Sequence, residues 1–323
     1  MLLAMADYAT DLEAIEHARS RIAPYAHRTP VMTCSTLDDL AGCRLFFKCE
    51  NLQKVGAFKF RGACNSVLRL PADVASRGVV THSSGNHAQA LALAASIRGV
   101  EAHVVMPDNA PTVKRRAVEG YGGRVYPCEP TLAAREATAR QVIERTGATL
   151  IPPYDHPDTI AGQGTVALEL LEQTERLDTI VAPIGGGGLV GGVTIAAKAV
   201  QPDVRIFAAE PSGADDAARS KKAGRLIPQT NPNTIADGLL TSLGAHTWPI
   251  IRDHVQDVIT VTDEQILAAM RLVWERMKTI IEPSAAVAVA AVLSDAFKSH
   301  HENARVGVVL SGGNVDLDRH LWS

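Results

Sequence analysis

The sequence predicts an α/β protein with mostly parallel sheets. Short apolar runs alternate with stretches of helical periodicity along most of the chain,. Strands of this apolar kind are typical of parallel sheets that are covered on both faces. Glycine-rich or small-residue loops follow two of these runs and lead into helices. These observations together indicate repeated strand–helix–strand units.

The expected elements follow one another in a regular order. Two helices have recognisable starts, since Thr262 and Gln265 have capping-box spacing and Pro283-Ser284 precede an apolar helix, 285–291, that we expect to be buried,. The other expected helices cover about 86–97, 113–118 and 132–145. Strands are expected at residues 78–81, 102–106, 124–126, 179–182, 205–208 and 306–310.

Composition argues against several classes of protein. The 323 residues carry a net charge of −3 and 4% aromatic residues, so neither nucleic acid nor an anionic membrane is an expected partner,. No apolar run approaches the roughly 20 residues of a membrane helix, and Met1–Ala6 lack the basic start of a signal peptide,. Five cysteines without Cys-x-x-Cys spacing favour a reducing, cytoplasmic location over disulfides or a zinc site,.

Residues 56–63, Gly-Ala-Phe-Lys-Phe-Arg-Gly-Ala, are the most informative segment. Lys59 stands there between Phe58 and Phe60. An apolar setting lowers the pKa of a lysine and frees its amine for Schiff-base chemistry. A lone lysine of this kind is more often a surface residue whose stem covers apolar neighbours. The interpretation of Lys59 therefore depends on the motifs that accompany it.

A second motif, His-Ser-Ser-Gly-Asn-His at residues 82–87, lies between an expected strand and an expected helix. The unpaired N–H groups of a helix start attract anions, and the carboxylate of an amino acid suits them. Asn86 can donate to a phenolate oxygen, and Ser84 can carry a proton. The alternative is a helix cap and turn without a ligand. His82 and His87 are not expected to bind metal, because no third ligand is near them in the sequence.

Residues 185–192, Gly-Gly-Gly-Gly-Leu-Val-Gly-Gly, follow an expected strand and open a helix. Their backbone can wrap a phosphate group. Gly186, Gly188 and Gly191 also satisfy G-x-G-x-x-G, with Glu210 about where a ribose-binding acid would lie,. A nicotinamide-dependent oxidoreductase is therefore an alternative, although it would leave the lysine motif and the 82–87 loop without a role.

Two late motifs complete the set. Glu210, Asp215 and Asp216 follow a strand, and such carboxylates suit a hard divalent cation, with a solvated turn as the alternative,. Ser311 opens a Ser-Gly-Gly-Asn stretch after the last strand and could hydrogen-bond a ring nitrogen; a simple turn is the alternative there. One lysine, two anion-binding loops and a late hydroxyl together favour pyridoxal phosphate as the cofactor.

In this order the motifs resemble those of the fold-type II pyridoxal-phosphate enzymes. The most similar branch contains serine racemases, threonine and serine dehydratases, and threo-3-hydroxyaspartate dehydratases. The resemblance extends from the His-Arg-Thr-Pro stretch at 27–30 to Asp316. It implies a tryptophan-synthase-β-like α/β fold with two open, twisted, mostly parallel sheets flanked by helices. It also implies a large cofactor-binding domain (1–52 and 153–323) and a small substrate-gating domain (53–152), with cofactor and substrate in the cleft between.

The same resemblance implies roles for individual residues. Lys59 would bind the cofactor covalently beside Phe58, with Asn86 at the phenolate oxygen and Ser311 at the pyridine nitrogen. The phosphate would be held by Gly185, Gly186, Gly187, Gly188 and the Leu189 amide. The substrate carboxylate would be surrounded by Ser83, Ser84, Asn86 and His87. Magnesium, or else calcium or manganese, would be bound by Glu210, Asp216 and the carbonyl of Ala214.

The implied activity is that of an ammonia-lyase, which eliminates water from a 3-hydroxy amino acid to give a 2-keto acid and ammonia. Lys59 would remove the α-proton, and Ser84 would be the proton carrier on the opposite face. Loss of the β-hydroxyl then gives dehydration, whereas reprotonation from Ser84 gives the enantiomer. A serine at the pyridine nitrogen would leave that nitrogen largely unprotonated, which favours prompt loss of the leaving group. Serine racemase as the main activity is the alternative.

The substrate choice among threo-3-hydroxyaspartate, L-serine and L-threonine stays open. Arg135 in the expected helix 132–145 could pair with a second substrate carboxylate and favour 3-hydroxyaspartate. A solvated helix arginine is the alternative. An inactive binding module and an O-acetylserine sulfhydrylase-like lyase are further interpretations. The acidic cluster and the lack of a Thr-Ser-Gly-Asn-Thr loop argue against the latter.

Some positions depart from the family pattern. Ala57 stands where a serine is common, and Ala286 where glycine is common. Val55 replaces a threonine near the nucleotide position of animal serine racemases, which puts nucleotide activation in doubt. Because the sequence ends soon after Asn314, we expect no C-terminal regulatory domain. A homodimer is expected, as in many relatives.

Overall fold

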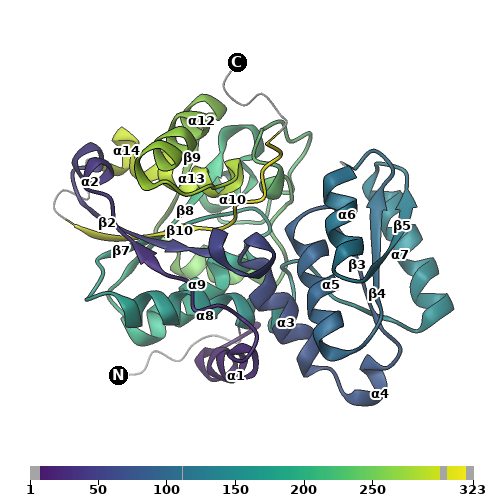
Figure 1. Ribbon diagram of the computed structural model, residues 1–323. Helices are drawn as coiled ribbons and strands as arrows, with labels where there is room; N and C mark the ends of the chain where they lie inside the picture. Colours follow the sequence, from purple (N-terminus) through teal and green to yellow (C-terminus); the bar gives the residue numbers. More distant parts are fainter. Residues whose placement is uncertain (1–7, 111, 299–303, 318–323) are drawn as a thin grey trace.

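The computed structural model describes residues 8–110, 112–298 and 304–317. A six-stranded sheet and a four-stranded sheet stand side by side in Figure 1 and organise these residues. Met1–Ala6, expected not to be a signal peptide, lie outside the described residues. Within the described ranges, no helix has the length and apolar character that crossing a membrane requires.

The six-stranded sheet has the order β1-β2-β10-β7-β8-β9, and only the pair β1–β2 is antiparallel. The carboxyl ends of its parallel strands therefore lie at one edge, where ligands usually bind in such sheets. Ser311 follows β10 at that edge, and the four-glycine run follows β7. The strands are β1 (Val31–Met32), β2 (Arg44–Cys49), β7 (Thr179–Pro183), β8 (Arg205–Pro211), β9 (Asp257–Val261) and β10 (Arg305–Leu310).

Helices cover both faces of this sheet (Figure 1). Alternate residues of β10 show the two-sided burial, since Val308 joins one hydrophobic core and Val309 the other. The first core contains α2 (Ser35–Ala41), α12 (Asp263–Leu272), the π-helical turn η5 (Val273–Met277), α13 (Pro283–Val292) and α14 (Asp295–Lys298). The second core contains α1 (Leu12–Ile22), α8 (Pro157–Gln173), α9 (Gly188–Val200), α10 (Asp216–Ala223) and α11 (Thr247–His254).

The four-stranded sheet is entirely parallel, with the order β5-β4-β3-β6. One face packs against α5 (Asn86–Arg98) and α6 (Thr112–Gly120), and the other against α7 (Leu132–Thr146). Helix α3 (Lys59–Arg69) and the short α4 (Ala72–Ala75) precede this sheet in the chain. Its strands are β3 (Val79–His82), β4 (Ala102–Pro107), β5 (Gly123–Cys128) and β6 (Thr149–Leu150).

The expected elements are present, with bounds that differ by one to a few residues. The capping box is confirmed, because the Thr262 side chain accepts from Gln265 N and the Gln265 side chain accepts from Thr262 N. All residues of α13 are buried, as its apolar sequence predicts. Several elements are additional to those expected, among them β2, β9 and α8. The remaining short turns are η1 (Glu50–Leu52), η2 (Lys54–Gly56), η3 (Ser212–Ala214) and η4 (Asp237–Leu239).

Candidate active site

Lys59 is the first residue of α3 and follows a segment that pairs with the chain after β10. Ala57 forms an isolated bridge with Gly312, and Phe58 N donates to Ser311 O at 3.1 Å. These contacts hold the lysine motif beside the carboxyl edge of the six-stranded sheet. Ser311, which is buried, therefore lies close to Lys59 although 252 positions separate them (311 − 59).

The amine of Lys59 lies in an aromatic and carbonyl environment. Its Nζ donates to Pro153 O at 2.7 Å and lies 5.2 Å from the centre of the Phe58 ring and 5.9 Å from that of Tyr154,. Burial lowers the pKa of Lys59 to about 8, while the charge of Glu282 opposes part of this shift,. A neutral, nucleophilic amine is therefore available close to physiological pH.

The four-glycine run forms a tight cradle at the start of α9. Gly187 has a φ of +86°, which a residue with a Cβ adopts only with strain,. A Cβ on Gly186 would collide with the ring of Tyr154. Thr247 Oγ1 donates to Gly186 O at 2.8 Å and fixes the loop from the far side. Gly185, Gly188 and the buried Leu189 complete the turn, and the free N–H groups of the helix start suit the phosphate of pyridoxal phosphate,.

The 82–87 loop joins β3 to α5, as expected. Ser83 and Ser84 are half-buried, and Ser83 Oγ accepts from Gly85 N at 3.4 Å. His87 is buried, its Nε2 lies 3.0 Å from Ile151 O, and burial with the nearby charge of Lys59 lowers its pKa to about 3. A neutral His87 that donates to Ile151 has no N–H left in its ring, so any donation to a substrate carboxylate must come from its backbone.

Asn86 lies in a network that sequence analysis did not predict. Its Nδ2 donates to Glu282 Oε1 at 2.8 Å, and its Oδ1 accepts from Asn314 Nδ2 at 2.8 Å. Asn314 N in turn donates to Glu282 Oε2 at 3.0 Å. Burial and then the charge of Asp237 raise the pKa of Glu282 to about 8, although the hydrogen bonds from Asn86 and Asn314 oppose this. The network fixes the orientation of the Asn86 amide beside Lys59.

The segment after β6 also contributes unpredicted residues. The carbonyl oxygen of Pro153 accepts a hydrogen bond from the Lys59 amine, and Tyr154 packs against the glycine cradle. Asp155 accepts hydrogen bonds from the backbone N–H groups of residues 245–247 at the start of α11. The prolines Pro152-Pro153 directly after a strand end were the only local signal for this wall of the site.

Arg135 lies in the first turn of α7 and is half-buried. Burial lowers the pKa of the His82 imidazole, the charge of Glu136 opposes this shift, and the charge of Arg135 adds to it, so Arg135 lies near the 82–87 loop. Arg135 Nε is buried and has no hydrogen-bond partner among the described residues. An unpaired buried guanidinium N–H near the 82–87 loop can donate a hydrogen bond to an anionic ligand.

The acidic residues at the end of β8 and just beyond it separate into two environments, with Glu210 inside the strand and not after it as expected. Glu210 is buried and its carboxylate accepts from Ala217 N at 3.0 Å and Ala218 N at 2.9 Å. Asp216 Oδ2 accepts from Leu243 N at 2.9 Å, whereas its buried Oδ1 has no partner in the described part of the chain. Burial raises the pKa of Glu210 to about 8 and that of Asp216 to about 6. Asp215 instead pairs with Arg219 at 2.7 Å.

These observations bear on two sequence hypotheses. Glu210 is fully buried and both its oxygens accept from backbone N–H groups of α10, so a ribose cannot reach it as a dinucleotide site requires, whereas a small ion could use the remaining lone pairs,. Buried carboxylates with raised pKa values and an unpartnered oxygen fit a hard cation. Among the described residues, no group of three or more His, Cys, Asp or Glu side chains is arranged to hold a metal ion, so such a cation would also need backbone carbonyls, among them that of buried Ala214.

The chain resembles known proteins over nearly its whole length. The family model described as "Pyridoxal-phosphate dependent enzyme" matches residues 22–312. A serine racemase from Oryza sativa subsp. indica is 53% identical over 318 residues, covering 98% of this chain and 94% of that protein. A beta-hydroxyaspartate dehydratase from Paracoccus denitrificans is 46% identical, covering 98% and 100%. The structure of maize serine racemase superposes with a TM-score of 0.95 at 54% identity, covering 96% and 95%. The fold-type II expectation is thus confirmed, and the chain belongs to the family of pyridoxal-phosphate-dependent enzymes.

Proposed function

We propose that this protein is a dehydratase that eliminates water from a 3-hydroxy amino acid, releases a 2-keto acid and ammonia, and also racemises its substrate. The observation that supports it most is the amine of Lys59, with its lowered pKa, beside the glycine cradle, Ser311 and Asn86.

Pyridoxal phosphate, when bound, supplies an electron sink that makes the α-proton of an amino acid acidic. Residues 185–189 would bind its phosphate, Asn86 its phenolate oxygen, and Ser311 its ring nitrogen, with Phe58 packed alongside. The α-proton would pass to Nζ of Lys59. Ser83, Ser84 and the N–H groups that begin α5, including those of Asn86 and His87, would hold the substrate carboxylate. The hydroxyl of Ser84 would return a proton to the opposite face.

Two features guide the choice of substrate. Arg135, with its unpaired Nε, favours a substrate that has a second carboxylate, such as threo-3-hydroxyaspartate,. The name of the Paracoccus relative points the same way. The serine racemases among the relatives support serine racemisation as the main activity instead. Dehydration and racemisation use the same residues, so we expect one site to perform both reactions in different proportions.

A divalent cation is part of this proposal. Glu210, Asp216 and the carbonyl of Ala214 would bind Mg²⁺, or else Ca²⁺ or Mn²⁺, because these ions prefer oxygen ligands. The unpartnered Oδ1 of Asp216 and the raised pKa values of both carboxyls support this assignment. The cation would lie at the start of α10, outside the cofactor cradle.

The domain organisation is part of the same proposal. Residues 1–52 and 153–323 would form the large cofactor-binding domain, and residues 53–152 the small domain that gates the substrate. Lys114 on α6 pairs with Asp237 of η4 at 2.5 Å, which joins the two parts across the expected cleft. Closure of the small domain would then bring Ser84 towards the substrate.

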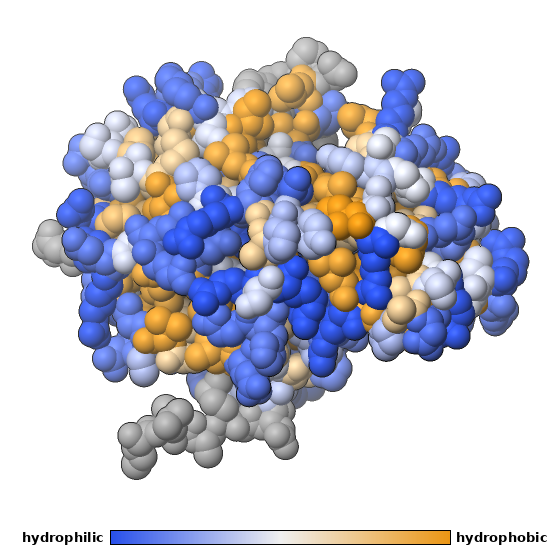
Figure 2. Space-filling view, turned by 60° about the horizontal axis from the view of Figure 1, so that its bottom comes forward, coloured by the Kyte–Doolittle hydropathy of each residue, from blue (hydrophilic) through white to orange (hydrophobic). Residues whose placement is uncertain are grey.

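A homodimer in the cytoplasm would complete this description. Leu52 and Ile280 are each 46% exposed, and Asn51 beside Leu52 donates to Ile280 O at 2.9 Å, so the two side chains belong to one surface region. Figure 2 shows that hydrophobic side chains form several separate patches among hydrophilic ones on the face it presents. All five cysteines are unpaired, which suits a reducing compartment,.

A substrate panel tests the proposal. The protein loaded with pyridoxal phosphate and magnesium is offered L-serine, D-serine, L-threonine and both threo-3-hydroxyaspartate enantiomers, and keto acid and chiral products are measured together. Oxaloacetate from one hydroxyaspartate enantiomer would identify a hydroxyaspartate dehydratase. Pyruvate with D-serine from L-serine would identify a serine racemase and dehydratase. Lys59→Ala should abolish both, whereas Lys222→Ala on the exposed side of α10 should not. Keto-acid production by Lys59→Ala would contradict the mechanism.

A further inference from the structure

A buried ion network surrounds Arg61, two residues after Lys59. The Arg61 side chain is fully buried. It donates to both oxygens of Glu50, at 2.7 and 2.8 Å, and to both oxygens of Glu169, at 2.7 and 2.8 Å. Thr165 Oγ1 accepts the remaining N–H at 3.2 Å. Every donor of this guanidinium is therefore used, which is the geometry in which arginine and lysine are least interchangeable.

Lys48 balances the charge of the network. Its Nζ donates to Glu169 Oε2, Thr29 O and Gln173 Oε1, each at 2.7 Å. Two buried cations thus face the two carboxylates, and all three ammonium hydrogens are paired. An ion network of this completeness gives little net stability compared with an apolar core, so its presence favours a role in fixing geometry.

The members of the network lie on different elements. Glu50 is in η1 after β2, and Glu169 is on α8, both attached to the six-stranded sheet. Arg61 is on α3, the helix that begins at Lys59. Residues two apart on a helix point about 200° apart, so Arg61 faces α8 while Lys59 faces Pro153,. Because its guanidinium points towards Glu50 and Glu169, Arg61 acts on the Lys59 amine through the helix that carries both.

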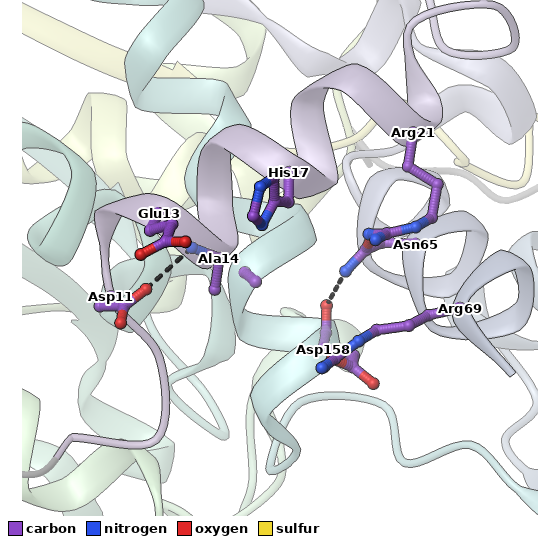
Figure 3. A pocket seen from close by; sticks show the side chains of 9 residues that line it. Asp11, Glu13, Ala14, His17, Arg21, Asn65, Arg69 and Asp158 are labelled. Carbon is purple, nitrogen blue, oxygen red and sulfur yellow. Dashed lines mark hydrogen bonds and ion pairs between the residues drawn. The ribbon is translucent and has the colours of Figure 1, made fainter.

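Other contacts also hold α3 against α8, but the described ones close to Arg61 involve uncharged groups. A Cβ on Gly162 would lie 2.6 Å from the Cα of Gly62, so the two backbones touch there. Gln163 Oε1 on α8 accepts from Gly62 N at 3.1 Å, and the hydroxyls of Ser66 and Thr159 lie 3.1 Å apart. At the outer end, Asn65 Nδ2 donates to Asp158 O at 2.7 Å and the exposed Arg69 pairs with the Asp158 side chain (Figure 3). These polar contacts border a surface pocket of about 270 Å³ whose charged groups near Asp158 are already paired.

We propose that Arg61 is a positioning residue for Lys59. Its bidentate hydrogen bonds to Glu50 and Glu169 fix the position of α3 along α8, and therefore the position of the Lys59 amine. This inference rests on the proposed function, in which Lys59 binds the cofactor and moves the α-proton. A shift of about 1 Å at a reacting group can lower a rate by about 100-fold. The network therefore acts on the rate of the reaction more than on the binding of substrate.

The test compares Arg61→Lys with a stability control. Lysine retains the charge but cannot fork onto two carboxylates. We expect kcat to fall about 100-fold with KM changed by less than about threefold. The pH midpoint for cofactor capture by the apoprotein, followed by visible absorbance, should also move by about half a unit or more. Leu37→Ala, in the core on the α2 side, should lower the unfolding temperature but leave kcat and the pH midpoint unchanged,.

Four outcomes would overturn the inference. A folded Arg61→Lys variant with the kcat and pH midpoint of the wild type would contradict this inference but leave the proposed function intact. If Leu37→Ala lowers kcat as much as Arg61→Lys does, the loss follows from lower stability and not from the position of Lys59. A wild-type protein that captures no cofactor would refute the proposed function and this inference with it. Should Arg61→Lys fail to fold, Glu50→Gln replaces it, since it keeps the shape of one acceptor without its charge; the same kinetic pattern is expected, and its absence would contradict the inference.

Discussion

Lys59 donates a hydrogen bond from its Nζ to the carbonyl oxygen of Pro153 at 2.7 Å. The lysine begins α3, and Pro153 follows β6 at the end of the four-stranded sheet. A carbonyl oxygen can accept from the amine but cannot neutralise its charge, so burial dominates and lowers the pKa of Lys59 to about 8,. The contact therefore holds the amine in place while leaving it easy to deprotonate.

Cofactor capture should depend on pH through this amine. Only the neutral amine attacks an aldehyde, so the rate at which the apoprotein captures pyridoxal phosphate should rise with pH, with a midpoint near 8,. Glu282→Gln removes a carboxyl that raises the pKa of Lys59 where it is ionised, above its own pKa of about 8, so the midpoint should move to lower pH. The growth of visible absorbance between about pH 6.5 and 9.5 measures this. Glu144→Gln on the exposed side of α7 is the control, and an equal midpoint in all three proteins would refute the assignment.

The two-base hypothesis predicts an unequal effect of Ser84→Ala. Removing a general acid typically lowers a proton-transfer rate by about 100-fold or more. Racemisation of an L-substrate needs a proton on the face opposite Lys59 and should show this loss, whereas elimination should fall much less. Chiral analysis and keto-acid release are measured in the same reaction. Ser76→Ala, at the end of α4, serves as the control. Parallel losses of both reactions would remove Ser84 from the proton-transfer role.

Much of the fold could be predicted because most strands are short apolar runs. The β9 strand did not give this signal, since it lies at an edge of the sheet and its Asp257 and Thr260 are exposed. The β2 strand ends in Lys48 and Cys49, and the buried charge of Lys48 is tolerated only because Glu169 of α8 faces it. A partner 121 positions away leaves no local trace in the sequence.

The same physical limit applies to the site. Lys59, Ser84 and the glycine run stand in local motifs whose chemistry the sequence reveals. Pro153 contributes a backbone carbonyl, which has no side-chain signature. Glu282 appears in the sequence only as the residue before a buried helix, and its role depends on contacts with Asn86 and the chain after β10. Residues that act through long-range contacts required the three-dimensional structure.

The cation hypothesis predicts that chelation destabilises the protein. A ligand present at 100 times its Kd stabilises the folded state by about 2.7 kcal/mol, which corresponds to several degrees in the unfolding temperature. Mg²⁺ should therefore raise the unfolding temperature of the chelated protein, and Asp216→Asn should remove most of that rise. Asp215→Asn is a matched control, because Asp215 pairs with Arg219 instead. An identical response of Asp216→Asn and the wild type would place the cation elsewhere.

If the protein prefers threo-3-hydroxyaspartate, Arg135 is the residue that we expect to select this substrate. A hydrogen bond to a charged group contributes about 1.5–3 kcal/mol, so loss of an Arg135–carboxylate pair should lower kcat/KM about 10- to 100-fold. Arg135→Gln should show this loss with threo-3-hydroxyaspartate and almost none with L-serine, which has no second carboxylate. Steady-state kinetics with both substrates measure the ratio. Arg140→Gln, on the same helix and paired only loosely with Glu136 at 4.0 Å, should leave the ratio unchanged. If Arg135→Gln lowers kcat/KM equally for both substrates, Arg135 supports the 82–87 loop and does not select the substrate. Only a direct contact with the second carboxylate would make the loss larger for threo-3-hydroxyaspartate than for L-serine.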